Sequence, residues 1–299
     1  MRRLLSLIVV VALAFAGCGD SDEPVDTTTP VTTTTTTATT AATTTTTATT
    51  TTTTPVVAEP ATMFMFLDST EPDGPFLAAI TPGVPGCCAD ELISTLDALV
   101  VGPTQDQIDM GISSVIPDGT VILGVDVVGG VATVDLSQQF TSGGGSMAME
   151  GRVAQIVWTT TQFDGIDAVR FAVGGTVIDF LGGEGIDVSE PRTRANTTSL
   201  LPAILIEEPA HGATVDVPFT LAGMGMVFEG EFMYTIVDAD GRIVLESFTA
   251  AQMPEIGVHG PFSVILDPDV EGAGAVIVWE QSAQDGSQIH VVEHPVVFG

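Results

Sequence analysis

The spacing of hydrophobic residues changes along the chain and divides it into four segments. Residues 4–15 form an apolar run broken only by Ser6, and residues 27–54 contain 22 threonines with no periodicity. From residue 61 onward, apolar residues recur at the spacings of strands and helices. We therefore expect the folded region to begin near residue 61, after a leader over residues 1–17 and a disordered Thr-rich tether over residues 18–60.

The first folded part, residues 61–190, mixes strand and helix patterns. Asp90 is the expected N-cap of a helix that ends at Gly102, and a second helix is expected over residues 146–161 with Ser146 as its N-cap. The predicted strands are residues 63–67, 76–80, 121–128, 131–136 and 168–173, with a hairpin turn at residues 129–130. This mixture indicates an α+β domain.

The second folded part, residues 203–299, shows only short strands. They are expected over residues 203–206, 219–222, 231–237, 243–248, 262–266, 275–279 and 289–292. Asp-Gly pairs at residues 240–241 and 285–286 are typical of hairpin turns. The spacing predicts a β-sandwich, joined to the first part by a hydrophilic bridge near residues 191–199.

Charge limits the range of partners. The 299 residues contain 38 acidic side chains and seven arginines, with no lysine, for a net charge of −31. Of these, 33 acidic residues and five arginines fall in residues 61–299, which gives the folded parts a charge of −28. Such a surface repels polyanions, so we expect neither nucleic acid nor bare anionic lipid as a partner.

The first 18 residues have the pattern of a targeting sequence. Arg2 and Arg3 precede the apolar run, which is too short to span a bilayer, and small residues lead to Cys18. This is the layout of a secretory signal peptide. The cysteine after the expected cleavage point resembles the lipobox of bacterial lipoproteins, and that resemblance implies a diacylglycerol on Cys18. The high threonine content of residues 27–54 is typical of an extended stalk, and its hydroxyl groups are candidates for O-glycosylation.

Cys87 and Cys88 are adjacent, in a protein expected in an oxidising compartment. A vicinal disulfide is strained because neighbouring Cα atoms lie only about 3.8 Å apart. We favour this disulfide over two free thiols, with pairing between molecules as the third alternative. Titration of thiols in the unreduced protein distinguishes free thiols from the two disulfide forms, since two reactive thiols per chain would exclude both disulfides.

The sequence contains only incomplete motifs for zinc, calcium and phosphate sites. His290 and His294 are four residues apart on a predicted strand, but Glu293 points to the opposite face and a zinc site lacks its remaining ligands. Residues 238–241 faintly resemble a calcium loop and are better explained as a turn. The glycines at residues 143–145 lack the lysine of a phosphate loop. We expect no cofactor, no metal and no catalytic residue.

The first folded part resembles the GerMN domain of sporulation and germination proteins. The matching segments are residues 99–104, 116–119, 134–137 with Phe140, 161–163 and 169–171. The segment around Cys87 and Cys88 departs from the family pattern. The resemblance implies a small α/β envelope module, related to ring-building folds, without known catalytic residues.

The second folded part resembles the immunoglobulin-like domain of bacterial spore germination, which often follows a GerMN domain. The matching segments are residues 209–213, 218–219, 221–223, 228–230 and 280–287. We therefore expect a non-catalytic binding or assembly module, anchored by Cys18 at the extracytoplasmic face of the bacterial membrane. Its expected partner is an envelope protein or a cell-wall polymer.

Two alternatives remain open at this stage. A hydrolase of envelope polymers would need paired carboxylates about 5 to 10 Å apart, for which the junction between the folded parts is the candidate place. A receptor for small solutes would need a hinged cleft between them. Sporulation by the organism itself does not follow from the family resemblance.

Overall fold

A computed structural model describes residues 58, 60–68, 74–183 and 185–299. The expected leader, the predicted lipid site at Cys18 and almost all of the expected tether lie outside the described residues. The described residues belong to one compact unit. Within these ranges, no helix is both long enough and apolar enough to cross a membrane.

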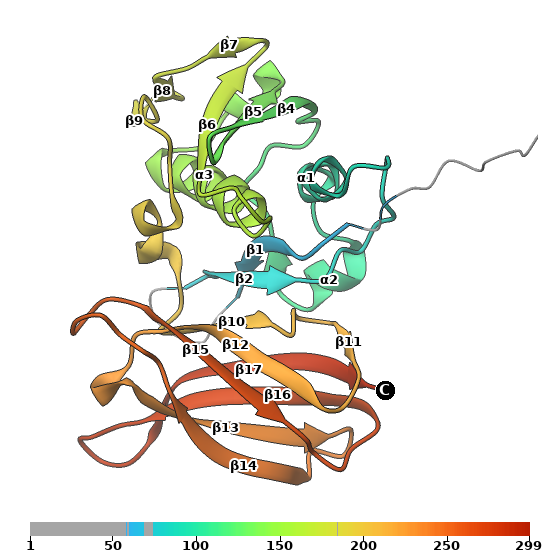
Figure 1. The fold of residues 1–299 in the computed structure, drawn as a ribbon, viewed down its shortest axis with the longest axis vertical. Coiled ribbons are helices and arrows are strands. Elements are labelled where there is room, and N and C mark those ends of the chain that lie inside the picture. Colours follow the sequence, from blue (N-terminus) through green and yellow to red (C-terminus); the bar gives the residue numbers. More distant parts are fainter. Residues whose placement is uncertain (1–57, 59, 69–73, 184) are drawn as a thin grey trace, which may run out of the picture. The chain divides into compact units, whose positions relative to one another are not determined.

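The first part combines three helices with short strands (Figure 1). Its strands and α-helices, with one 3₁₀ turn, are β1 (Met63–Leu67), β2 (Phe76–Ile80), α1 (Glu91–Val101), α2 (Gln105–Asp109), β3 (Ile112–Ser113), β4 (Ile122–Val128), β5 (Val131–Leu136), η1 (Gln138–Thr141), α3 (Ser146–Thr160), β6 (Ala168–Val173), β7 (Thr176–Val177), β8 (Phe180–Leu181) and β9 (Ile186–Asp187).

The strands of this part form two main sheets, in the orders β2-β1-β3 and β4-β5-β6-β7. The expected hairpin joins β4 to β5, and Gly129 and Gly130 turn it with φ angles of 60° and 81°. Such angles suit glycine because it has no Cβ. Strand β5 then pairs in parallel with β6. A parallel pair needs a long crossover, which α3 supplies.

The helix signals in the sequence are largely confirmed. Asp90 caps α1, and its carboxylate accepts a hydrogen bond from the Ile93 N–H at 2.9 Å, while Gly102 ends the helix with φ 85°. The expectation that Ser146 caps α3 is wrong. Gly145 has the extended backbone of an N-cap, and Ser146 is already the first helical residue. The chain turns through Gly143 and Gly144 at positive φ, so the helix begins after Gly145.

The second part is a sandwich of strands, as the sequence predicts, preceded by two 3₁₀ turns in the bridge (Figure 1). These elements are η2 (Arg194–Asn196), η3 (Thr198–Leu200), β10 (Ile204–Glu208), β11 (Thr214–Val215), β12 (Phe219–Gly225), η4 (Phe228–Gly230), β13 (Glu231–Asp238), β14 (Ile243–Ala250), β15 (Gly260–Leu266), β16 (Gly272–Gln281) and β17 (Gln288–Phe298). One sheet has the order β10-β12-β15 and the other β11-β17-β16-β13-β14. The predicted α+β part followed by a β-sandwich is confirmed.

Strand β1 is buried on both faces. Met63 and Met65 belong to the core of the first part, whereas Phe64 and Phe66 belong to a second cluster. That second cluster also contains Leu205 of β10, so it joins the two parts. A continuous apolar run is typical of a strand covered on both sides. The two parts therefore share a buried apolar layer, and the expected boundaries at residues 190 and 203 stay predictions.

Candidate functional site

The junction between the two parts contains a cavity of about 490 Å³. Phe76 and Ala78 of β2 line it from the first part, and Ile204 of β10 lines it from the second. Most of its lining is apolar, and the main polar groups are the side chains of Asp68, His211, Glu293 and His294. A hydrolase would need its paired carboxylates at this junction, so the burial and the contacts of these four side chains bear on that alternative.

His211 and His294 lie side by side in this junction. Their ring centroids are 5.3 Å apart, and their residues are 5% and 1% exposed. His294 Nε2 donates to the Ala79 carbonyl of β2 at 3.4 Å, while its Nδ1 is buried without a partner. Burial lowers the pKa of His294 to about 3, with a further contribution from His211, and burial also lowers the pKa of His211. Both rings are therefore neutral at physiological pH.

The backbone around His211 connects the two parts directly. His211 forms a parallel bridge with Ile80, and its N–H donates to the Ala79 carbonyl at 2.8 Å. The next residue, Gly212, donates to the Pro295 carbonyl of β17 at 2.8 Å. The loop before β11 thus bonds β2 of the first part and β17 of the second.

The other two histidines do not join this pair. His290 lies 3.7 Å from Glu280, and its φ of 53° marks an irregularity in the pairing of β16 with β17. His259 is buried and donates from Nε2 to the Pro202 carbonyl at 3.0 Å. His290 and His294 thus have different partners despite their spacing, and no group of three or more metal-ligating side chains is found in the described part of the chain.

The geometry gives the hydrolase alternative little support. Asp68 and Glu293, the two carboxylates of the cavity lining, are both exposed. Glu280 is the single buried carboxylate in the described ranges, and it accepts a hydrogen bond from the Phe228 N–H at 3.0 Å. A raised pKa on a catalytic acid usually requires burial or a close second carboxylate. Asp68 and Glu293 lack the burial, so the described lining of the cavity offers no buried acid for this role.

Arg194 and Trp158 form a second set of contacts at the junction. The Arg194 guanidinium carbon lies 4.3 Å from the centroid of the Trp158 ring, and Nη1 pairs with Glu207 of β10 at 2.7 Å. Trp158 is 1% exposed and donates from Nε1 to the Thr197 hydroxyl at 2.9 Å. Stacking and an ion pair both hold an arginine in place, and here they connect α3, the bridge and β10.

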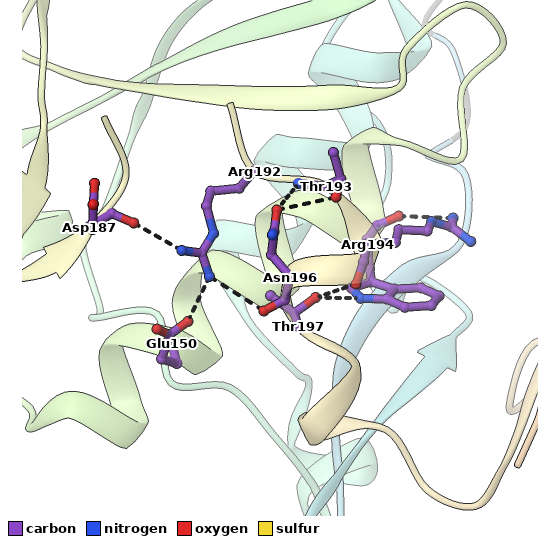
Figure 2. Close-up of polar contacts among 8 residues, drawn as sticks. Glu150, Asp187, Arg192, Thr193, Arg194, Asn196 and Thr197 are labelled. Atoms are coloured by element: carbon purple, nitrogen blue, oxygen red, sulfur yellow. Dashed lines mark hydrogen bonds and ion pairs between the residues drawn. The ribbon is translucent and has the colours of Figure 1, made fainter. Parts of the chain in front are cut away.

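Figure 2 shows that the bridge is bound along its length rather than loosely connecting two domains. Arg192 donates to the Asp187 carbonyl at 2.9 Å and pairs with Glu150 of α3 at 3.2 Å. Thr193 and Asn196 close a capping box within the bridge. Hydrophilic composition suggested only a bridge near residues 191–199, and these contacts show that its polar side chains belong to the junction.

The turn at residues 238–241 is a hairpin turn, as expected. Asp238 Oδ1 accepts from the backbone N–H groups of Asp240 and Arg242, and Oδ2 pairs with the Arg242 side chain at 3.1 Å. The hydrogen bond from the Arg242 N–H is the main cause of a lowered pKa for Asp238. Gly241 has φ 74°, which completes the turn. The Asp238 oxygens are thus occupied by hydrogen-bond donors.

Cys87 and Cys88 are free thiols in the structure, with their sulfur atoms 2.8 Å apart. The Cys87 N–H donates to the Ser94 hydroxyl of α1 at 3.0 Å, which holds the pair beside the helix. Desolvation, followed by hydrogen bonds with Asp97 and Cys88, raises the pKa of the Cys87 thiol to about 12. The vicinal disulfide stays a prediction.

The few arginines of the folded parts are largely used inside the molecule. Arg152 is 3% exposed and donates to the carbonyls of Phe140 and Gly143 at 2.7 and 2.8 Å. Arg192, Arg194 and Arg242 pair with carboxylates. Arg152, Arg192 and Arg194 therefore help to hold the fold together, whereas Arg242, whose side chain is 78% exposed, forms a surface ion pair within its own turn. They offset little of the acidic character of the surface.

Comparison with known proteins identifies both parts. Residues 65–179 match the family model described as sporulation and spore germination, and residues 203–287 match the immunoglobulin-like domain of bacterial spore germination. No curated protein matches the chain.

Two solved structures from Bacillus subtilis are similar. The first GerMN domain of the sporulation protein GerM is 23% identical, with 45% of this chain and 97% of that chain covered and a TM-score of 0.38. The tandem GerMN domains of the same protein are 16% identical, with 69% of this chain and 60% of that chain covered and a TM-score of 0.39. The family matches show that this chain carries a GerMN domain of sporulation and spore germination, followed by an immunoglobulin-like domain of bacterial spore germination.

Proposed function

We propose that the protein is a lipid-anchored, non-catalytic binding or assembly module at the extracytoplasmic face of the bacterial membrane. The observation that carries the proposal is the shared junction. The cluster around Phe64, Trp158 and Leu205 and the Arg194–Glu207 ion pair hold both parts in one compact unit. A compact unit with a shared buried layer presents surfaces of both domains to a partner at the same time, which suits assembly.

Anchoring through Cys18 is tested by substitution. Cys18→Ala removes the thiol that would carry the lipid, and we expect the variant to leave the membrane fraction for the soluble fraction. Two acyl chains give stable anchoring, whereas the acidic folded part has no attraction of its own for anionic headgroups. Fractionation of cells with immunodetection measures the distribution. Cys88→Ala is the matched control and should stay with the membrane; retention of Cys18→Ala there would refute the anchor.

The binding role is tested separately by photo-crosslinking in cells. A photoreactive residue is placed at exposed positions of both parts, Val128 (68% exposed) and Ile265 (74% exposed) among them. We expect an adduct of defined mass with an envelope component from at least one position, and no release of fragments when the purified protein is incubated with isolated cell wall. Release of wall fragments, abolished by one carboxylate substitution, would replace this proposal by the hydrolase.

A further inference from the structure

The larger sheet carries an aromatic hollow of about 390 Å³ beside its edge strand β14, and none of the residues that line this hollow lines the junction cavity. Its lining residues, which we call the Phe228–Phe248 hollow, are Phe228, Glu229, Glu231, Phe232, Met233, Phe248, Gln281 and Ala283. Figure 1 shows β14, which carries Phe248, as the last strand of the five-stranded sheet. An edge strand offers unpaired backbone donors and acceptors to another chain.

Two phenyl groups at this hollow are unusually exposed. Phe228 is 63% exposed and Phe248 is 62% exposed, whereas Phe232 beside them is 2% exposed and belongs to the core. On the solvent face, Phe248 lies opposite Met233, and Met233 lies opposite Trp279 on the next strand. Three large side chains thus follow one row across the sheet. Exposed aromatic side chains grouped in this way mark interaction surfaces.

The loop that carries Phe228 is held in place by buried groups. The Phe228 N–H donates to Glu280 Oε1 at 3.0 Å, and Glu280 is only 6% exposed. The Gly230 carbonyl accepts from the Ala251 N–H at 2.8 Å. Glu229 between them has φ 57°, a conformation that residues other than glycine rarely adopt. Local strain of this kind occurs at binding sites when the surroundings enforce it.

Negative charge around the hollow favours a positively charged ligand. Glu229 and Glu231 are exposed at its rim, and the folded parts carry a net charge of −28. A second copy of the chain would bring the same charge, so self-association at this edge is opposed. A cation that lies over aromatic rings and close to carboxylates gains from both interactions. The aromatic and acidic lining therefore fits a basic side chain.

We propose that the Phe228–Phe248 hollow binds a lysine or arginine side chain on an extended segment of a partner polypeptide, with the segment lying along the edge of β14. This inference deepens the proposed binding function and rests on it. The open strand edge favours a polypeptide over a wall polymer, because main-chain groups of an extended peptide can continue the sheet.

The test measures binding of a peptide of alternating lysine and valine to the full-length purified chain by calorimetry. We expect Phe248→Ala and Phe228→Ala to weaken binding about tenfold each, because aromatic anchors dominate such contacts. Ile265→Ala, at an exposed position on the edge strand of the other sheet, is the matched control and should bind as the wild type does. All three positions are exposed, so an unchanged urea midpoint confirms folding.

A second arm separates the hollow from general attraction to an acidic protein. The measurements are repeated in about 1 M salt, where the Debye length is about 3 Å and diffuse attraction is screened. The Phe248→Ala difference should persist there. Equal binding by wild type and Phe248→Ala at both salt concentrations, or no binding to the wild type, overturns the site.

The outcomes also distinguish this inference from the proposed function. Loss of binding to isolated cell wall in Phe248→Ala, without any binding of the peptide, assigns the hollow to a wall polymer and refutes the polypeptide. Adducts in cells from Val128 or Ile265, combined with no effect of Phe248→Ala, refute the hollow and leave the binding function standing.

Discussion

Trp158→Ala is expected to lower the free energy of unfolding by about 3–5 kcal/mol, the usual cost of truncating a buried aromatic side chain. The substitution empties part of the apolar layer between the two parts, where Trp158 lies 5.4 Å from Phe64 between ring centroids. It also removes the ring beneath Arg194 and the donor to Thr197. Urea unfolding, followed by far-ultraviolet circular dichroism, measures the change.

Phe180→Ala is the control for this substitution, since Phe180 is 61% exposed and its truncation should cost little. Because Phe64 and Leu205 share the layer with Trp158, we expect the wild type to unfold in a single transition. A Trp158→Ala variant as stable as the wild type would show that the two parts do not depend on this layer.

Lowering the pH from 6.5 to 4.5 is expected to cost the wild type about 2–3 kcal/mol of unfolding free energy through His294. Burial holds the pKa of His294 at about 3, below its ordinary value of 6.5. Between these values the unfolded chain binds a proton that the folded chain does not. The full stability is therefore present above pH 6.5 and falls as the pH approaches 3, and His211 adds a loss of the same sign.

The measurement compares urea unfolding of the wild type and His294→Gln at both pH values. The variant should lose the His294 share of the pH dependence, while His290→Gln, at a half-exposed position, should keep it. Carboxylate titration is common to all three proteins and cancels in the comparison. An identical pH dependence in wild type and His294→Gln would contradict the buried neutral histidine.

Most regular elements were predictable from the sequence because their signals are local. The cap at Asp90, the stop at Gly102 and the glycine pair at residues 129–130 each act within a few residues. The one-turn helix α2 and the two-residue strands were missed, since they are too short to show a period.

The junction was not predictable, because its partners are far apart in the sequence. Periodicity assigns one buried face to α3, but Ala154 and Trp158 bury a second face against residues that include Leu205. The same applies to Phe64 and Phe66, because they pack in a cluster with Leu205 of β10, which is about 140 residues away in the sequence. Arg192 and Arg194 carry a usable sequence signal, because two of the five arginines in residues 61–299 lie within the short bridge.

The double burial of β1 has a mechanical consequence. Among the described residues, β1 is the first strand that follows the Thr-rich segment, so tension applied to the chain from its N-terminal side would reach this strand before the others. Its alternating side chains are held in two separate apolar cores, and its backbone pairs with both β2 and β3. Extraction of β1 would break both cores at once. We therefore expect the two domains to resist a pull from the N-terminal side together, and not to unfold one after the other.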